Sequence, residues 1–522
     1  MKKNYLITAP PPTPNGDLHV GHISGPYFAA DVFARYQTVR GHDVVYASGS
    51  DQNQTYVVTT AERLKTNPKE LGIKYHYKIR ESLDKCSINI NGFLLPDDQH
   101  ADLVQQFIFK LYKLGVIKEK EKEYWYSEEL GRYLFEAYIN GFCNNCYAET
   151  KGGICESCGH PNDSFNLPLA SATGSKSTIV SKKVKGLYFE IENYREALKR
   201  YLEPIYQTMR PHLQKLLKDL LSKPLADFPI SYPSSYGIPV NIHGYEDQVI
   251  NVWAEMVPGL MGASVIDKDR NPVDIDKLWK NKSTTKLVQF LGFDNSYFFT
   301  VLHPALLMAC NEDYILPSNF ITNEFYLLDN FKFSTSQNHV IWARDIVETI
   351  TNDELRFFVS YTNPELFQSN FNASDLKVVV KNYLTSHVDN LIVIYNKIYK
   401  EYDITQAFPD LSEAFKQNLE WFYEEFEQAY HEDSFSVKKG VNTLTLYLQW
   451  LVDYARVKEE TQEVGFANEF IYGLLALVSF SHPLLPDFSY RLKSGLNIQS
   501  PIVWKMHADT KIGDLNPITS LF

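Results

Sequence analysis

Two histidines stand three residues apart in a stiff, proline-rich stretch near the start of the chain. The stretch "APPPTPNGDLHVGH" covers residues 9–22 and ends in His19-Val20-Gly21-His22. Two imidazoles beside the N-terminus of a helix can join backbone N–H groups and the helix dipole in holding phosphate. Gly21 would let a flat ring approach the backbone. The alternative is a turn with two surface histidines, and the strand-like segments on either side argue against it.

A second candidate phosphate site lies far along the chain, in "NFKFSTSQNHVIW", residues 330–342. It places Lys332 in a polar loop with the hydroxyl side chains Ser334, Thr335 and Ser336. A lysine, hydroxyls and backbone N–H groups can neutralise a triphosphate while charge moves onto a leaving pyrophosphate. Solvated lysine and serine loops are common, so this loop carries weight only together with the histidines.

Four of the six cysteines fall within residues 143–158. Cys143 and Cys146 form one Cys-x-x-Cys pair, Cys155 and Cys158 form the other, and a short glycine-containing loop separates them. Two such pairs can supply four thiolates to a closed tetrahedral zinc site. A closed site leaves no position for substrate, so we expect a structural zinc. Two disulfides are the alternative, but this clustering favours a metal site in a reducing compartment.

The histidines need a sheet to position them, and the sequence supplies its elements. "NYLITA", residues 4–9, predicts a buried strand, residues 22–41 predict a helix, and "VVYAS", residues 44–48, predicts a second strand before a loop with Asp51. Strand, helix and strand make a unit of a parallel sheet, in which ligands bind at the carboxyl ends of the strands. Both histidines and Asp51 fall at that edge.

The whole chain has the composition of a multidomain globular protein. Its 522 residues are too many for one hydrophobic core, so we expect two to four domains. The first residues lack an apolar signal segment, and no run of about 18 apolar residues occurs, which predicts a cytoplasmic protein without a membrane span. The net charge of −12 gives no overall attraction for nucleic acid, although a local basic groove is compatible with it.

Together the two phosphate motifs resemble those of the class I aminoacyl-tRNA synthetases, and of the methionyl-tRNA synthetase family in particular. The segments that carry the resemblance are "PNGDLHVGH", "ADVFARYQTVRGHDV", "YLFEAYINGFCNNC", "VWAEMVPGLMGA", "QFLGFDNSYF" and "KFSTSQNHVIWARD". It implies an α/β fold, with a Rossmann-type (HUP) parallel-sheet core, a zinc-knuckle insertion and a C-terminal α-helical bundle. The expected parts are residues 1–115 and 236–330 for the two halves of the core, 116–235 for the insertion, 331–385 for the lysine loop and a stem-contact region, and 386–522 for the bundle.

The resemblance also implies adenylate chemistry, in which an amino-acid carboxylate attacks the α-phosphate of Mg-ATP and pyrophosphate leaves. Catalysis is then positioning and charge stabilisation. Carried over by position, the catalytic residues are His19, His22 and Lys332. The residues matched to ATP binding are Asn15, Gly21, Gly292, Asp294, Phe333, Ser334 and Ser336. Those matched to amino-acid binding are Pro11, Thr13, Asp51, Trp253, Met256, Asn295 and Phe299.

The two aspartates and the zinc site each need a further word of description. Asp51 matches the acid that binds the substrate ammonium, and the alternative is a cap of the following helix. Asp294 matches a ribose-binding aspartate, and the alternative is a plain loop carboxylate. One zinc is expected, because "YSEELGRY" stands where some relatives carry a second Cys-x-x-Cys pair.

The half of the site that would hold the substrate side chain departs from the family's pattern. Thr13 replaces an aromatic residue, and Met256, Val257 and Leu260 replace a small residue, a proline and a tyrosine. Asn295 and Phe299 replace an apolar residue and a histidine, Gln52, Asn53 and Gln54 follow Asp51 in place of the usual His-Gly, and Gln337 replaces an arginine. A buried Asn295 would need a partner that a polar substrate atom could supply. The alternative is that Asn295 is satisfied internally and that methionine still fits.

The C-terminal part combines a helical pattern with an unfavourable charge for RNA. Periodic stretches in residues 386–522 predict an antiparallel helical bundle. This part carries 11 Lys+Arg against 19 Asp+Glu, a net charge of −8, and Asn390 fits the family's anticodon-binding pattern whereas the stacking Pro-Trp pair is missing. RNA recognition favours local cations and aromatic side chains. We therefore expect a divergent anticodon-binding domain or a bundle kept only for structure.

Three functions follow from the sequence. The first is ATP-dependent amino-acid activation with transfer to a small-molecule acceptor, as in synthetase-like proteins of natural-product pathways. Some of these act beside a zinc cupin, and because this chain has no cupin segment a separate partner enzyme would be needed. The second is a genuine methionyl-tRNA synthetase with tRNA as acceptor. The third is a non-catalytic adenylate-binding scaffold, which the retention of five residues argues against: His19, His22, Asp51, Asp294 and Lys332.

Overall fold

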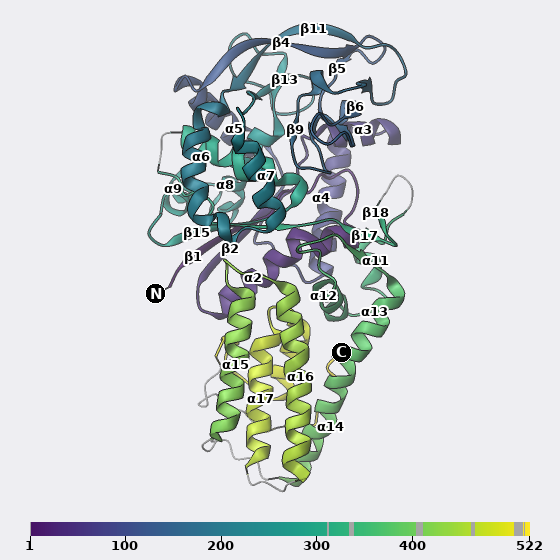
Figure 1. Ribbon diagram of the computed structural model, residues 1–522, viewed down its shortest axis with the longest axis vertical. Coiled ribbons are helices and arrows are strands. Elements are labelled where there is room, and N and C mark those ends of the chain that lie inside the picture. The colour runs from purple at the N-terminus through teal and green to yellow at the C-terminus, as the bar shows by residue number, and fades with distance from the viewer. Residues whose placement is uncertain are drawn as a thin grey trace.

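The structure is a computed structural model that describes residues 2–310, 313–333, 339–402, 411–460, 465–505, 515 and 517–522. Three tiers are visible in Figure 1: a strand-rich insertion at the top, a sheet with its covering helices in the middle, and a helical bundle at the bottom. The expected Ser334, Thr335, Ser336 and Gln337 lie outside the described residues.

The middle tier is built on a five-stranded parallel sheet. Its strand order is β16-β15-β1-β2-β3. The strands are β1 (Asn4–Thr8), β2 (Asp43–Gly49), β3 (Gly92–Leu94), β15 (Thr285–Gly292) and β16 (Asn319–Asn323). Leu6 of the central β1 pairs with Val45 on one side and Leu287 on the other, and all three belong to the apolar interior. The two strands predicted at residues 4–9 and 44–48 are confirmed, as is the parallel Rossmann-type class.

The helix predicted over residues 22–41 is interrupted near its start. A short α1 (Val20–His22) leads into a wide turn over Ile23–Tyr27, and α2 (Phe28–Val39) follows. Gly25 takes a non-helical ψ of −140°, and Pro26 has no N–H to donate. The chain therefore bends between the two histidines and the long helix.

The first half of the core contributes three further helices, and the insertion follows them. The helices are α3 (Thr55–Leu64), α4 (Pro68–Lys85) and α5 (Asp98–Lys113). The insertion contains β4 (Ile117–Ser127), β5 (Arg132–Tyr133), β6 (Ile139–Phe142), β7 (Glu149–Lys151), β8 (Gly153–Ile154), β9 (Pro161–Asn162), β10 (Ser171–Ala172), β11 (Val180–Phe189), α6 (Arg195–Leu202), α7 (Pro211–Ser222), β12 (Phe228–Pro229) and β13 (Ser231–Pro233). The longest pairing is antiparallel, between β4 and β11.

The chain then returns to the sheet. This segment consists of β14 (Gln248–Ile250), α8 (Val252–Ala263), α9 (Pro272–Trp279) and α10 (His303–Ala309), with β15 between the last two helices. Every residue of α8 is buried, because it packs between the sheet and α5. The helix α8, which is apolar apart from Glu255, is therefore part of the core that surrounds the site.

The last part joins the core to the bundle. It contains β17 (Tyr326–Leu328), β18 (Phe331–Lys332), α11 (Ala343–Ile346), α12 (Asn352–Tyr361), β19 (Ser369–Phe371) and α13 (Ala373–Val380). The bundle contains α14 (Ser386–Glu401), α15 (Glu413–Tyr430), α16 (Val437–Glu460), α17 (Phe466–Ser481) and α18 (Pro486–Gly495). The predicted helical bundle is confirmed. The domain boundaries at residues 115, 235, 330 and 385 stay predictions.

No helix within the described ranges has both the length and the apolarity that a membrane crossing requires.

A buried ion pair links α2 to α12. Arg356 and Asp31 are each 1% exposed, and the Arg356 Nη2–Asp31 Oδ2 distance is 2.8 Å. Arg356 also donates to the carbonyls of Pro483 and Leu484, at 3.0 and 2.7 Å, in the turn between α17 and α18. Burial disfavours the charged carboxyl, but Arg35 and Arg356 together hold the pKa of Asp31 below its ordinary value.

We expect Arg356→Met to lower the free energy of unfolding by about 3–5 kcal/mol, since it leaves the buried carboxylate of Asp31 with only one of its two arginine partners. The matched control is Lys277→Met, which removes an exposed ion pair with Asp274 and should change stability by less than about 1 kcal/mol. Urea denaturation followed by tryptophan fluorescence measures both. Equal losses in the two variants would show that the buried pair does not hold these elements together.

Candidate active site

The two histidines lie where β1 has ended and α1 begins. His19 is the residue before α1, and its backbone N–H donates to His22 Nδ1 at 3.2 Å. Their rings are stacked with centroids 3.7 Å apart. Burial lowers the pKa of His22 to about 4, and burial together with the neighbouring His22 lowers that of His19 well below its ordinary value. Both imidazoles are therefore neutral at pH 7.

The histidine motif is in contact with the lysine loop. The Phe333 ring lies flat on the His19 ring, with centroids 4.4 Å apart and planes 4° apart. A Cβ on Gly21 would lie 2.8 Å from the Phe333 ring, so only glycine permits this stacking. In this structure the flat ring that approaches the backbone at Gly21 belongs to the protein's own Phe333.

Lys332 immediately precedes that phenylalanine and is half-exposed. Its ammonium lies 3.1 Å from a carboxylate oxygen of Glu156, and it also lies over the Phe325 ring, 4.4 Å from the centroid. Glu156 belongs to the cysteine-rich segment of the insertion, between Cys155 and Cys158. The insertion therefore reaches the lysine that the sequence assigns to the leaving pyrophosphate.

Asp51 follows β2 and is 6% exposed. Its backbone N–H donates to the Pro12 carbonyl at 3.0 Å, which ties it to the proline-rich stretch. It does not cap α3, because the residue preceding that helix is Gln54. Burial raises the pKa of Asp51 well above its ordinary value, and the nearby Glu255 and Glu136 add to this effect. A cation placed here would favour the ionised form.

Asp294 and Gly292 lie at the carboxyl end of β15, on the same edge of the sheet. Burial raises the pKa of Asp294 to about 6, with a further contribution from Glu156 that Lys332 opposes. Asn295 is only partly buried and hydrogen-bonds to the Asp294 side chain. The two alternatives that the sequence left open for Asn295 stay predictions. Asn15 and Thr13 are also partly buried, on the proline-rich stretch.

The residues predicted to bind the amino acid fall into two groups. Pro11, Asp51 and Met256 line one small cavity of about 30 Å³. Trp253 and Phe299 pack elsewhere: the Trp253 ring stacks on Phe298 with centroids 3.6 Å apart and planes 6° apart, and Phe299 packs against His303. Within the described ranges, Thr13 and Asn295 do not belong to the lining of that cavity.

Sequence reasoning missed a buried polar network beside Asp51. Asn53 donates to both oxygens of Glu255, at 2.9 and 3.1 Å, and His100 Nε2 lies 2.8 Å from Glu255 Oε1. Glu255 and His100 are 5% and 3% exposed. The one available signal was the acid in the otherwise apolar "VWAEMVPGLMGA". Glu156 was missed because it stands between two cysteines, where nothing in the sequence points to a contact with Lys332.

The four clustered cysteines form a compact group of free thiols. Their sulfur atoms all lie within 4.8 Å of one another, and the Cys143–Cys158 and Cys146–Cys155 sulfur pairs are 3.7 and 3.6 Å apart. Four sulfurs about 2.3 Å from a central zinc define a tetrahedron with edges of about 3.8 Å. The geometry therefore fits a tetrahedral ion, and none of the four is in a disulfide.

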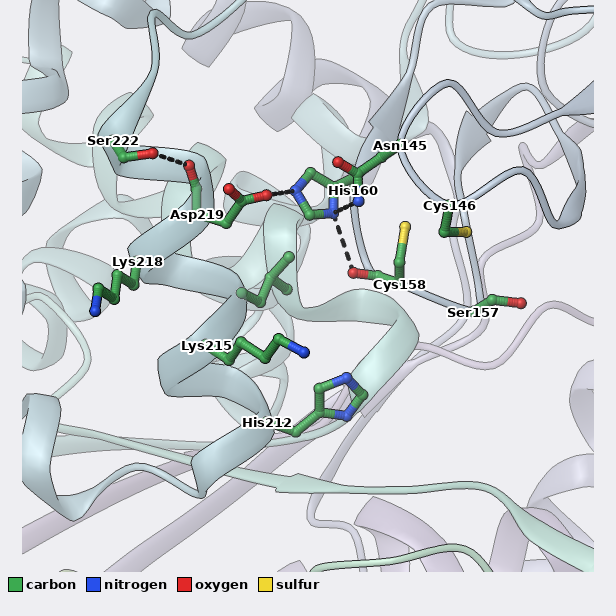
Figure 2. Close-up of a pocket in the computed structure, with 11 residues that line it drawn as sticks. Asn145, Cys146, Ser157, Cys158, His160, His212, Lys215, Lys218, Asp219 and Ser222 are labelled. Atoms are coloured by element: carbon green, nitrogen blue, oxygen red, sulfur yellow. Dashed lines mark hydrogen bonds and ion pairs between the residues drawn. The ribbon is translucent and has the colours of Figure 1, made fainter.

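A cleft of about 660 Å³ separates this cysteine group from α7 (Figure 2). The ion pair between His160 Nε2 and Asp219, at 2.8 Å, crosses it. His212 of α7 stacks on Phe293 with centroids 3.5 Å apart, so the helix packs against the residue that precedes Asp294. Together with the contact between Glu156 and Lys332, this contact places the insertion beside both Asp294 and Lys332.

Comparison with known proteins gives a consistent family. Residues 5–394 match the family described as tRNA synthetases class I (M). The methionine–tRNA ligase of Bacteroides fragilis is 29% identical over 522 residues, which cover 96% of this chain and 76% of the relative. That of Pyrococcus furiosus is 26% identical, covering 96% and 72%. The fold is similar to that of Mycobacterium tuberculosis methionyl-tRNA synthetase in complex with methionyl-adenylate, with a TM-score of 0.78 at 16% identity over 100% of both chains.

We expect the purified protein to contain about one zinc per chain, with zinc–sulfur distances near ~2.3 Å by X-ray absorption. Cys143→Ser should lose the metal and destabilise the insertion. Cys310→Ser is the matched control, because Cys310 is a buried free thiol outside the cluster, and it should keep the metal. Protein without zinc, or a disulfide among the four clustered cysteines, would contradict the assignment.

Proposed function

The chain belongs to the class I tRNA synthetases of the methionyl group, and we propose that it activates an amino acid with ATP to an aminoacyl-AMP and passes the acyl group to a small-molecule acceptor. The observation that carries the activation step is the contact between the two phosphate motifs. His19 and Phe333, far apart in sequence, stack on each other at 4.4 Å, beside Asp51 and Asp294 at the same sheet edge.

In the proposed activation step, a carboxylate oxygen of the amino acid attacks the α-phosphorus, and the bond from that phosphorus to pyrophosphate breaks. His19 and His22 are neutral, so each would give an N–H to a phosphate oxygen without bringing a charge of its own. Mg²⁺ bound with ATP supplies positive charge to the phosphates. Lys332 would supply the positive charge of the protein to the leaving pyrophosphate, after exchanging Glu156 for phosphate.

Asp51 would bind the amino acid, and Asp294 would bind the ribose of ATP. The ammonium group of the amino acid would pair with Asp51, which restores its ionised form. Asp294 is ionised at neutral pH and would accept hydrogen bonds from ribose hydroxyls. No side chain acts as a nucleophile, so the rate enhancement comes from holding carboxylate and phosphate together.

The bundle supports an acceptor other than tRNA. Its sequence is acidic and lacks the family's stacking Pro-Trp pair. Asn390, which fits the family's anticodon pattern, has its side-chain oxygen 2.8 Å from Arg456 and its amide 2.8 Å from the Ser386 carbonyl. Because both polar atoms of the Asn390 side chain already have hydrogen-bond partners, this side chain has less capacity to bind a base. A hydroxyl or amine on a small molecule, such as an N-hydroxylated amine, would take the acyl group instead, with a separate partner enzyme for later steps.

The second candidate is transfer to tRNA, as in an ordinary methionyl-tRNA synthetase. The names of the relatives favour it, and so does their coverage, since the aligned length extends through the bundle. The five bundle helices, α14 to α18, are all formed although the sequence of residues 386–522 is acidic. The two candidates share the activation step and differ only in the acceptor.

We expect His22→Ala and Lys332→Ala each to slow adenylate formation by roughly 10–10³-fold, the range for losing one contact to developing charge. Asp51→Ala should mainly weaken amino-acid binding. Pyrophosphate exchange, scanned over the proteinogenic amino acids, measures both. His243→Ala is the control, because His243 is fully exposed in the loop between β13 and β14. If His22→Ala, Lys332→Ala and Asp51→Ala all keep the wild-type rate, the site is elsewhere.

For the acceptor, we expect little or no acid-precipitable label after incubation with ATP, radiolabelled amino acid and total tRNA. The adenylate should be released slowly and consumed when a small hydroxyl- or amine-bearing acceptor is added. Binding of tRNA should stay weak even at low salt, where phosphate contacts are strongest. Robust formation of methionyl-tRNA would establish the second candidate in place of the first.

A further inference from the structure

The small cavity beside Asp51 has a polar wall with two unsatisfied atoms. Within the described residues, Ser48 Oγ and His100 Nδ1 have no hydrogen-bond partner, although Ser48 is 1% and His100 3% exposed, and both residues line the cavity. A buried polar atom without a partner is destabilising, because it has lost its hydrogen bonds to water. A ligand group that both donates and accepts a hydrogen bond could satisfy the two atoms.

The orientation of His100 is fixed by the neighbouring network. Its Nε2 faces Glu255 at 2.8 Å, and Glu255 is held in turn by Asn53. The other ring edge, with Cε1 and Nδ1, faces Gly259, which also lines the cavity: a Cβ on Gly259 would lie 3.0 Å from Cε1 and 3.8 Å from Nδ1. When Nε2 carries the proton that Glu255 accepts, Nδ1 is left as an acceptor toward the cavity.

The apolar wall is already filled by the protein. Met256 and Leu260 line the cavity and are 5% and 2% exposed. Trp253 is stacked flat on Phe298. The side chain of Met256 itself occupies volume where the family's pattern has a small residue. A long apolar substrate side chain would have to displace these packed groups.

The remaining space sets the size of the substrate. The cavity measures about 30 Å³. One water molecule needs about 10–15 Å³ on this scale, so the cavity has room for about two heavy atoms. Because Asp51 forms one side of it, those atoms would belong to the side chain of an amino acid whose ammonium pairs with Asp51.

We propose that the amino acid activated by this protein carries a small hydroxyl-bearing side chain, of the size of serine, whose hydroxyl is bound by Ser48 Oγ and His100 Nδ1. The proposal rests on the activation step proposed above and specifies its substrate. The hydroxyl would donate to His100 Nδ1 and accept from Ser48 Oγ–H, which satisfies both atoms at once. Glu255 and Asn53 act as positioning residues, since they orient the His100 ring.

The test is pyrophosphate exchange by the full chain with each proteinogenic amino acid. Serine should exceed alanine and methionine in kcat/KM by at least about 10²-fold, because a site built to bind a hydroxyl rejects the analogue that lacks it. Higher kcat/KM for methionine, glycine or another amino acid than for serine would overturn the substrate assignment alone. No exchange with any amino acid would overturn the proposed activation step as well, so the two failures are distinct.

Two variants sharpen the test. Ser48→Ala should lower the preference for serine over alanine by about 10-fold, and Ser489→Ala, a buried serine of α18 with a partner of its own, should leave the preference unchanged. Met256→Ala should raise kcat/KM for methionine relative to serine by at least about 10-fold, because it reopens apolar space. An unchanged serine preference in Ser48→Ala would contradict the proposed hydroxyl contact.

Discussion

The buried ion pair between Asp31 and Arg356 is the constraint that holds the active site in one piece. Asp31 lies on α2, the helix that follows the histidine motif, and Arg356 lies on α12, which follows the lysine loop. The arginine also donates to carbonyls at Pro483 and Leu484, in the bundle. Buried pairs of this kind add little net stability against an apolar replacement, but breaking one is costly. Its consequence is therefore geometric: two distant motifs and the bundle cannot shift independently.

Few of the side chains at the active site carry a positive charge. Burial makes both histidines neutral and raises the pKa of Asp51, so Lys332 is the cation that the two phosphate motifs contribute. On the proposed assignment, the substrates would bring the opposite charges, an ammonium for Asp51 and phosphates for Lys332. The charged groups of such a site interact with bound reactants and developing charge more than with one another. This is expected where catalysis is electrostatic positioning.

Sequence reasoning succeeded where a pattern is local and repeated. The strands at residues 4–9 and 44–48, the bundle helices and the cysteine group each follow from periodicity or spacing within one segment. It failed where a residue acts through a distant partner. Asn53 and Glu255 are far apart in the chain, and neither suggests the other. The break at Gly25 was missed because the apolar pattern of a helix continues across it, and the stacking of Phe333 on His19 depends on how the whole loop folds back.

The contact between Lys332 and Glu156 shows how the insertion can serve the site without obstructing it. Both side chains are more than half exposed, at 52% and 58%, and an exposed pair contributes about 0–1 kcal/mol. A triphosphate presents several negative charges to the same lysine and would displace one carboxylate at little cost. On the proposed assignment, the insertion would hold the lysine through Glu156 and would release it when ATP binds. A buried pair in the same place would hold the lysine too firmly to be exchanged, so the exposure of this contact is what makes it compatible with catalysis.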